Sequence, residues 1–70
     1  MNELEAKMGI VKWFSKEKGY GFIACGGKDY FVHHRQIIGK GYQFLVPEQR
    51  VKFIPGMGQK GEVANNVEKM

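Results

Sequence analysis

Four ring-bearing side chains recur at alternate positions in two short segments of the sequence. They are Tyr20 and Phe22 in KGYGFI and Phe31 and His33 in YFVHH. Side chains two residues apart lie on the same face of an extended strand. Rings that share an exposed face offer π surfaces on which other planar rings can stack. We therefore predict that these residues form a surface for binding planar groups.

Positive charge is concentrated in the same half of the chain. The whole chain has a net charge of +4, and residues 7–40 hold seven of the eleven lysine and arginine residues but only Glu17 and Asp29 as acids. Lysines attract phosphates whatever the nucleotide sequence, and stacking one base on an aromatic side chain contributes about 1–3 kcal/mol. Aromatic side chains in a positively charged part of the chain predict a partner that exposes both bases and phosphates. Single-stranded nucleic acid does so, whereas a duplex hides its base faces.

The other reactive side chains give no indication of catalysis or of a metal site. Cys25 has no evident activating base beside it and is interpreted as a small turn residue. His33 and His34 are adjacent, so in a strand they would point to opposite faces and could not share one metal ion. One imidazole on an open surface also lacks the second acid or oxyanion stabiliser that RNA cleavage needs. We expect no enzyme activity, no metal and no cofactor.

Length and composition indicate one small globular domain. The chain has 70 residues, of which 43% are hydrophobic and 26% charged. Its single cysteine cannot form an internal disulfide, which favours a reducing compartment. The start of the chain, MNELEAKMGI, is acidic where an export signal is basic, and the apolar stretches are too short to span a membrane. We expect a cytoplasmic monomer with a tail at residues 1–7 and one domain at residues 8–70.

Short extended segments separated by turn residues must position the rings. The pattern predicts turns at SKEK, CGGK and PGMGQKG, and a helical turn near residues 35–38 followed by a long loop. It predicts strands at residues 8–14, 19–24, 29–34, 49–54 and 61–67. Five strands in so short a chain favour an all-β, five-stranded antiparallel barrel, because closing a sheet removes its exposed edges.

Alternation within the predicted hairpin separates the rings from the core. If Ile23 and Val32 point into the barrel, the outer face carries Tyr20, Phe22, Phe31 and His33. The alternative is that the aromatic residues are simply core, as most such residues are. A barrel of this size cannot hold the seven Phe, Tyr and Trp rings of the predicted strands together with its valines and isoleucine, which favours an outer position for some of them.

Three motifs in order resemble those of the cold-shock domain family. They are GIVKWF at residues 9–14, KGYGFI at residues 18–23 and YFVHH at residues 30–34, the last two being similar to the family's two ribonucleoprotein motifs. The resemblance runs from about Met8 to Val67 and implies an OB-fold barrel that binds single-stranded RNA and DNA. It implies nucleic-acid contacts by Lys12, Trp13, Lys18, Tyr20, Phe22, Phe31, His33, His34 and Tyr42.

Two residues depart from the family pattern. His34 stands where the family usually has phenylalanine, so it offers less stacking surface, and strict alternation points it inward unless a bulge or strand end intervenes. Tyr30 replaces a usually aliphatic core residue and needs room for its ring and a partner for its hydroxyl. The chain is also more basic than many bacterial members, which predicts a larger phosphate contribution and less selectivity.

The sequence leaves two kinds of binding function open, and a third alternative, ribonuclease activity, would require RNA to be cut rather than held. One is a protein that holds unpaired RNA or DNA and so destabilises competing secondary structure by mass action. The resemblance implies that it acts as an RNA chaperone or antiterminator and prefers pyrimidine-rich stretches of about six or seven nucleotides. The other is a protein-docking adaptor whose aromatic patch meets an apolar partner. Salt distinguishes the two, because added salt weakens phosphate contacts steeply and apolar docking little.

Overall fold

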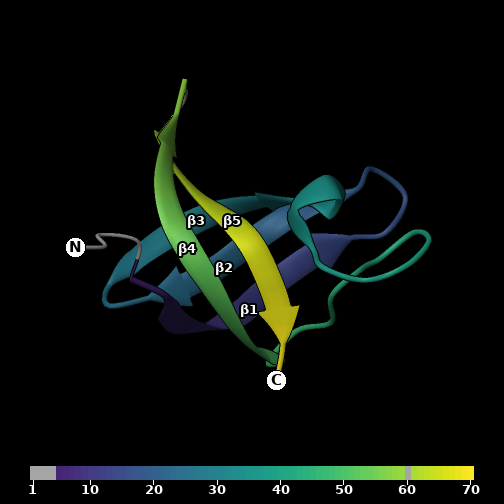
Figure 1. Cartoon of the computed structure of the whole chain (residues 1–70), viewed down its shortest axis with the longest axis horizontal. Helices are drawn as coiled ribbons and strands as arrows, with labels where there is room; N and C mark the ends of the chain where they lie inside the picture. Colours follow the sequence, from purple (N-terminus) through teal and green to yellow (C-terminus); the bar gives the residue numbers. More distant parts are fainter. Residues whose placement is uncertain (1–4, 60) are drawn as a thin grey trace.

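Five strands form a closed barrel in the computed structural model, which describes residues 5–59 and 61–70 (Figure 1). Around the barrel the strands follow the order β1-β2-β3-β5-β4, and β4 pairs back with β1. Their bounds are β1 (Lys7–Ser15), β2 (Tyr20–Cys25), β3 (Lys28–His33), β4 (Arg50–Gly58) and β5 (Gly61–Lys69), with a short 3₁₀ helix η1 (His34–Gln36) after β3. The predicted all-β, five-stranded barrel is confirmed.

One strand pairing is parallel, although the sequence analysis predicted an antiparallel barrel. Strands β3 and β5 run in the same direction, with Phe31 opposite Val63. The other four pairings are antiparallel. A closed ring with an odd number of strands cannot alternate in direction throughout, so at least one parallel pair is a geometrical necessity.

The β2–β3 hairpin turns at two glycines, as the CGGK motif predicted. Gly26 and Gly27 have φ angles of 59° and 81°. Positive φ at both central residues is the geometry that matches the twist of a two-residue hairpin, and glycine adopts it without a steric penalty. The tight turn fixes the register of β2 on β3, so that Phe22 lies opposite Phe31.

The fourth strand is longer than predicted, and the PGMGQKG turn is correspondingly shorter. Strand β4 continues through Pro55 to Gly58, where the sequence analysis placed a turn. Pairing of β4 with β1 ends at Phe53, so Pro55 lies where β4 has only β5 as a neighbour. A strand tolerates proline where one of its edges is unpaired. Lys60, in the same predicted turn, lies outside the described residues.

The predicted tail at residues 1–7 is described only in part. Residues 1–4 lie outside the described residues, and Lys7 already belongs to β1, where it pairs with Phe53. No helix in the described part of the chain is long and apolar enough to cross a membrane.

The barrel interior is filled by aliphatic side chains around two rings. Phe53 is fully buried and its ring centroid lies 4.9 Å from that of Tyr30, which is 4% exposed. Tyr30 therefore takes the core position that alternation predicted, together with Val32. Ile37 and Leu45, from the segment between β3 and β4, are also buried and anchor that segment to the core.

Candidate nucleic-acid interface

Four rings from three neighbouring strands meet on the outside of the barrel. Trp13 of β1, Tyr20 and Phe22 of β2 and Phe31 of β3 form a closed group, which we call the aromatic platform. The centroid distances are 5.6 Å for Trp13–Phe22 and Tyr20–Phe31, 5.8 Å for Phe22–Phe31 and 5.9 Å for Trp13–Tyr20. All four rings are at least partly exposed, and Trp13 is 42% exposed. The structure thus brings these four predicted residues together on one surface.

A β-bulge in β1 turns Trp13 outward, which the sequence analysis did not predict. Val11 pairs with Ile23 and Trp13 pairs with Phe22, so β1 advances two residues where β2 advances one. A bulge of this kind places two consecutive residues on the same side of the sheet. Beyond it the alternation is reversed, and Phe14 packs against the hydrophobic core.

Gly21 allows β1 and β2 to approach closely beneath the platform. A Cβ atom at this position would overlap the backbone carbonyl oxygen of Trp13 and lie 2.7 Å from the Cα atom of Phe14. These are main-chain atoms, which cannot move aside as a flexible side chain could. Glycine at position 21 is therefore a condition for the bulge that turns Trp13 onto the platform.

The two histidines lie side by side, contrary to the prediction that they point to opposite faces. Strand β3 ends at His33, and His34 begins η1, so strict alternation no longer applies. Their ring centroids are 4.4 Å apart, and the centroid of Tyr42 lies 4.9 Å from that of His34. We call these three residues the histidine–tyrosine cluster. His33 pairs across the sheet with Tyr20, which joins the cluster to the aromatic platform.

The position of His34 depends on a glycine in the β1–β2 turn. The backbone N–H of His34 donates to the carbonyl oxygen of Gly19 at 2.8 Å. A Cβ atom on Gly19 would lie 2.6 Å from Cδ2 of His34, and the φ angle of Gly19 is +81°. The positive φ favours glycine, and a larger residue at position 19 would displace the His34 ring. Strand β3 therefore ends before His34, as the sequence analysis required for a His34 side chain that lies outside the core.

The structure shows no arrangement of metal ligands in the part of the chain that it describes. No group of three or more His, Cys, Asp or Glu side chains lies close enough together to hold an ion. Cys25 is half-buried and packs partly against the core. The neighbouring imidazoles of His33 and His34 thus have no third described ligand of these types.

The predicted lysines border the platform in different ways. Nζ of Lys12 lies 3.1 Å from a carboxylate oxygen of Asp29, and both side chains are about half exposed. Exposed ion pairs of this kind contribute only about 0–1 kcal/mol, so a phosphate can compete for the lysine. The side chain of Lys18 is exposed, and its backbone N–H donates to Oγ of Ser15 at 3.1 Å. Lys18 therefore also helps to close the turn next to Tyr20.

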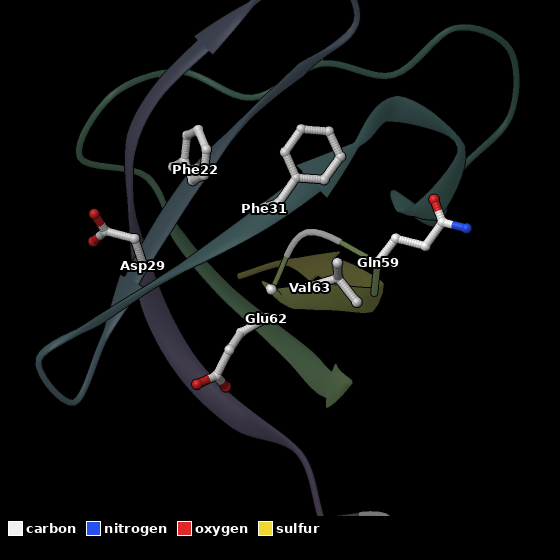
Figure 2. Close-up of a pocket in the computed structure, with 7 residues that line it drawn as sticks. Phe22, Asp29, Phe31, Gln59, Glu62 and Val63 are labelled. Carbon is white, nitrogen blue, oxygen red and sulfur yellow. The ribbon is translucent and has the colours of Figure 1, made fainter. Parts of the chain in front are cut away.

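A hollow of about 420 Å³ adjoins the platform where β3 meets β5. Figure 2 shows Phe31 between Phe22 and Val63, with the carboxylates of Asp29 and Glu62 directed away from the rings. The sequence analysis did not predict Val63 or Glu62 near the platform, because they come from a strand that is distant in the sequence. Phe44 was also missed, although it lies two residues after Tyr42 and is 36% exposed.

The folded structure keeps the imidazole of His33 neutral at a lower pH than that of a free histidine. Its pKa is lowered from 6.5, mainly because burial disfavours the charged imidazole and further because His34 and Arg35 add positive charge nearby. Nδ1 of His33 also accepts the backbone N–H of Arg35 at 3.2 Å. Neutral His33 therefore carries its proton on Nε2, which is available as a hydrogen-bond donor.

Acidification is expected to destabilise the folded protein through His33. The unfolded chain binds a proton at a pKa near 6.5, and the folded chain binds it only at lower pH. The contribution of neutral His33 to stability is thus complete above pH 6.5 and falls as the pH drops below that value, because the unfolded state then binds more protons. Thermal unfolding at about pH 7.5 and about pH 5.5 measures the effect. The His33→Gln variant should lose less stability between these values than the unmodified protein, and an equal loss would contradict the assignment.

The sequence is similar to a known family of nucleic-acid-binding domains. The chain matches the family model described as the "'Cold-shock' DNA-binding domain" over residues 7–70. It is 48% identical over 62 residues to the cold shock-like protein CspA of Bordetella pertussis, covering 86% of this chain and 92% of that protein. It is 51% identical over 61 residues to the cold shock-like protein CspG of Shewanella violacea, and the match covers 84% of this chain and 87% of that protein. The chain therefore belongs to the cold-shock domain family, whose members are non-enzymatic nucleic-acid binders.

Proposed function

We propose that this protein binds single-stranded RNA and DNA by stacking unpaired bases on the aromatic platform. The observation that carries the proposal is the group of four partly exposed rings on one face, with centroids 5.6–5.9 Å apart. Adjacent rings at this spacing leave their outer surfaces free for bases, each stacked base contributing about 1–3 kcal/mol. A duplex keeps its bases stacked on one another and cannot use such a surface.

The predicted site residues divide into two roles in this proposal. Trp13, Tyr20, Phe22 and Phe31 stack bases, and His34 and Tyr42 extend the stacking surface beyond β3. Lys12, Lys18 and His33 contact phosphates or the nucleotide backbone, His33 through its Nε2 proton. The smaller ring of His34 supplies less contact area than the phenylalanine that is usual in the family.

In the cell the protein would act as an RNA chaperone or antiterminator in the regulation of transcription and translation. Binding unpaired segments of about six or seven nucleotides, preferably pyrimidine-rich, shifts the folding equilibrium of RNA away from secondary structure. This action needs no cofactor and no catalytic residue. Its relatives are named as cold shock proteins, and this likeness supports the role. We also propose a cytoplasmic location and a monomeric state.

The dependence of affinity on salt tests this function against the protein-docking alternative. For a labelled oligothymidine, the logarithm of the association constant should fall with the logarithm of the salt concentration by about 0.7 for each phosphate contacted. Lys18→Gln should reduce this slope by about one such contact, and Lys52→Gln, on β4 away from the platform, should leave it unchanged.

A slope near zero would contradict the proposal and favour apolar docking. An oligoribonucleotide should also remain intact after incubation with the pure protein. Cleavage would favour the ribonuclease alternative, which requires chemistry that the platform does not supply.

A further inference from the structure

Phe44 forms an exposed aromatic site outside the predicted interface. It lies in the loop between η1 and β4 and is 36% exposed. Nζ of Lys16 lies 4.4 Å from the centroid of its ring, and Nζ of Lys69 lies 5.8 Å from it. The three residues come from the loop, the β1–β2 turn and the end of β5, so folding assembles this combination of one ring and two ammonium groups.

Contacts of the neighbouring residues hold the loop around Phe44 in place. The hydroxyl of Tyr42 donates to the backbone carbonyl of Lys16, and Nζ of Lys69 donates to Oε1 of Gln43 at 2.9 Å. The next residue, Leu45, is 2% exposed and anchors the loop in the core. A loop held in place before binding loses little conformational entropy when a ligand stacks on a side chain that it carries.

The Phe44 site continues the histidine–tyrosine cluster. The ring of Tyr42 lies 4.9 Å from that of His34, and Lys16 contacts Tyr42 through its carbonyl and Phe44 through its ammonium group. Figure 1 shows the loop, coloured teal to green, and the blue β1–β2 turn projecting from the same end of the barrel. A single strand that passes over Tyr42 in this direction would meet Phe44 next.

We propose that Phe44, Lys16 and Lys69 form an additional nucleotide subsite at one end of the bound strand. Phe44 stacks a base, and the two lysines contact its phosphate. The inference rests on the proposed binding of single strands and adds a position to it. A cation over an exposed ring is held only weakly, so a base can take the ring face while the ammonium group moves to the phosphate.

The two positive charges close to the ring favour a nucleotide over an apolar protein partner. An apolar partner covering Phe44 would also remove the ammonium groups of Lys16 and Lys69 from water without supplying a counter-charge, which is costly. A nucleotide supplies a planar ring and a negative phosphate together. The subsite therefore matches the chemistry of both parts of one nucleotide.

Oligonucleotide length provides the test. Oligothymidines from about four to about ten nucleotides should bind the unmodified protein more tightly with length until the subsite is filled. Phe44→Leu should leave the affinity for the shortest oligonucleotides unchanged and weaken binding of the longest by roughly tenfold. Phe44→Trp should keep the full affinity. Val46→Ala, which removes another exposed apolar side chain from the same loop, should have no effect at any length.

A fluorescent base identifies the stacked nucleotide directly. With 2-aminopurine at the 5′ or the 3′ end of the longest oligonucleotide, one of the two probes should be quenched by the unmodified protein and by Phe44→Trp, but not by Phe44→Leu. Lys16→Gln provides a second variant that keeps the ring, and it should weaken binding of long oligonucleotides and reduce the salt slope by about 0.7.

The outcomes separate this inference from the proposed function. If Phe44→Leu binds every length as the unmodified protein does, or binds every length more weakly by the same factor, the subsite does not exist. In either case the platform would still be supported by weaker binding of a Phe22→Ala variant. If the unmodified protein binds no single strand at any length, the proposed function itself fails, and the subsite fails with it.

Discussion

Gly21→Ala is expected to destabilise the protein by at least about 3 kcal/mol, because overpacking a well-filled site typically costs about 1–3 kcal/mol and here the obstruction is backbone. The added Cβ would overlap the carbonyl oxygen of Trp13 and approach Cα of Phe14 to 2.7 Å. A domain of this length has a total stability of only about 3.5–10 kcal/mol. The expected loss is therefore at least about a third of the total stability, and the urea concentration at the unfolding midpoint should fall by at least the same fraction.

Urea unfolding gives the required free energies, and Gly26→Ala is the matched control. Gly26 has a positive φ of 59° but open space around its Cβ position, so alanine there should cost only about 1–2 kcal/mol of backbone strain. If Gly21→Ala proves as stable as the unmodified protein, β1 and β2 do not approach as closely as described. The β-bulge in β1 that turns Trp13 outward would then also be contradicted.

Phe22→Ala is expected to weaken the binding of single strands by about 1–3 kcal/mol, or roughly 5- to 150-fold. Phe22 is central to the platform, with its ring 5.6 Å from that of Trp13 and 5.8 Å from that of Phe31. It also lines the hollow beside Val63, so its removal takes away a stacking face and the lateral support of two others. Phe22 is only partly buried and lies outside the core cluster, so the variant should still fold.

Fluorescence anisotropy of a labelled oligothymidine measures this loss of affinity, and the thermal unfolding midpoint checks the fold. Ile38→Ala is the control, because Ile38 is 52% exposed and lies in the segment after η1, outside the platform. It should bind as the unmodified protein does. A folded Phe22→Ala variant with unchanged affinity would show that the platform does not carry the binding.

The sequence predicted those parts of the site that depend on local pattern. Alternation in the second and third strands placed Tyr20, Phe22 and Phe31 outside, and the glycine pair at residues 26–27 predicted the hairpin that aligns them. Both inferences need only the two-residue period of a strand and the geometry of a tight turn. The resemblance to the family added Trp13 and Tyr42, whose positions alternation alone did not determine.

The parts that were wrong or missed depend on contacts between distant residues. Trp13 is turned outward by a bulge that needs Gly21 on the neighbouring strand. His33 and His34 lie side by side because β3 ends between them. The Phe44 site requires a loop, a turn and a strand end to meet. Periodicity in the sequence does not indicate contacts between distant residues, so these contacts could be found only in the folded chain.

Fluorescence of Trp13 provides the most direct test of single-strand binding. Trp13 is the only tryptophan, is 42% exposed and contacts both Tyr20 and Phe22, so a base stacked on the platform should change its emission. The protein would be titrated with oligothymidine and oligouridine of about seven nucleotides at low and moderate salt, with a blunt duplex as the control. We predict saturable quenching by both single strands that weakens with salt and is much smaller with the duplex. If neither single strand changes the emission at tens of micromolar, and a labelled-oligonucleotide assay agrees, the platform does not bind nucleic acid and the protein-docking function becomes the better account.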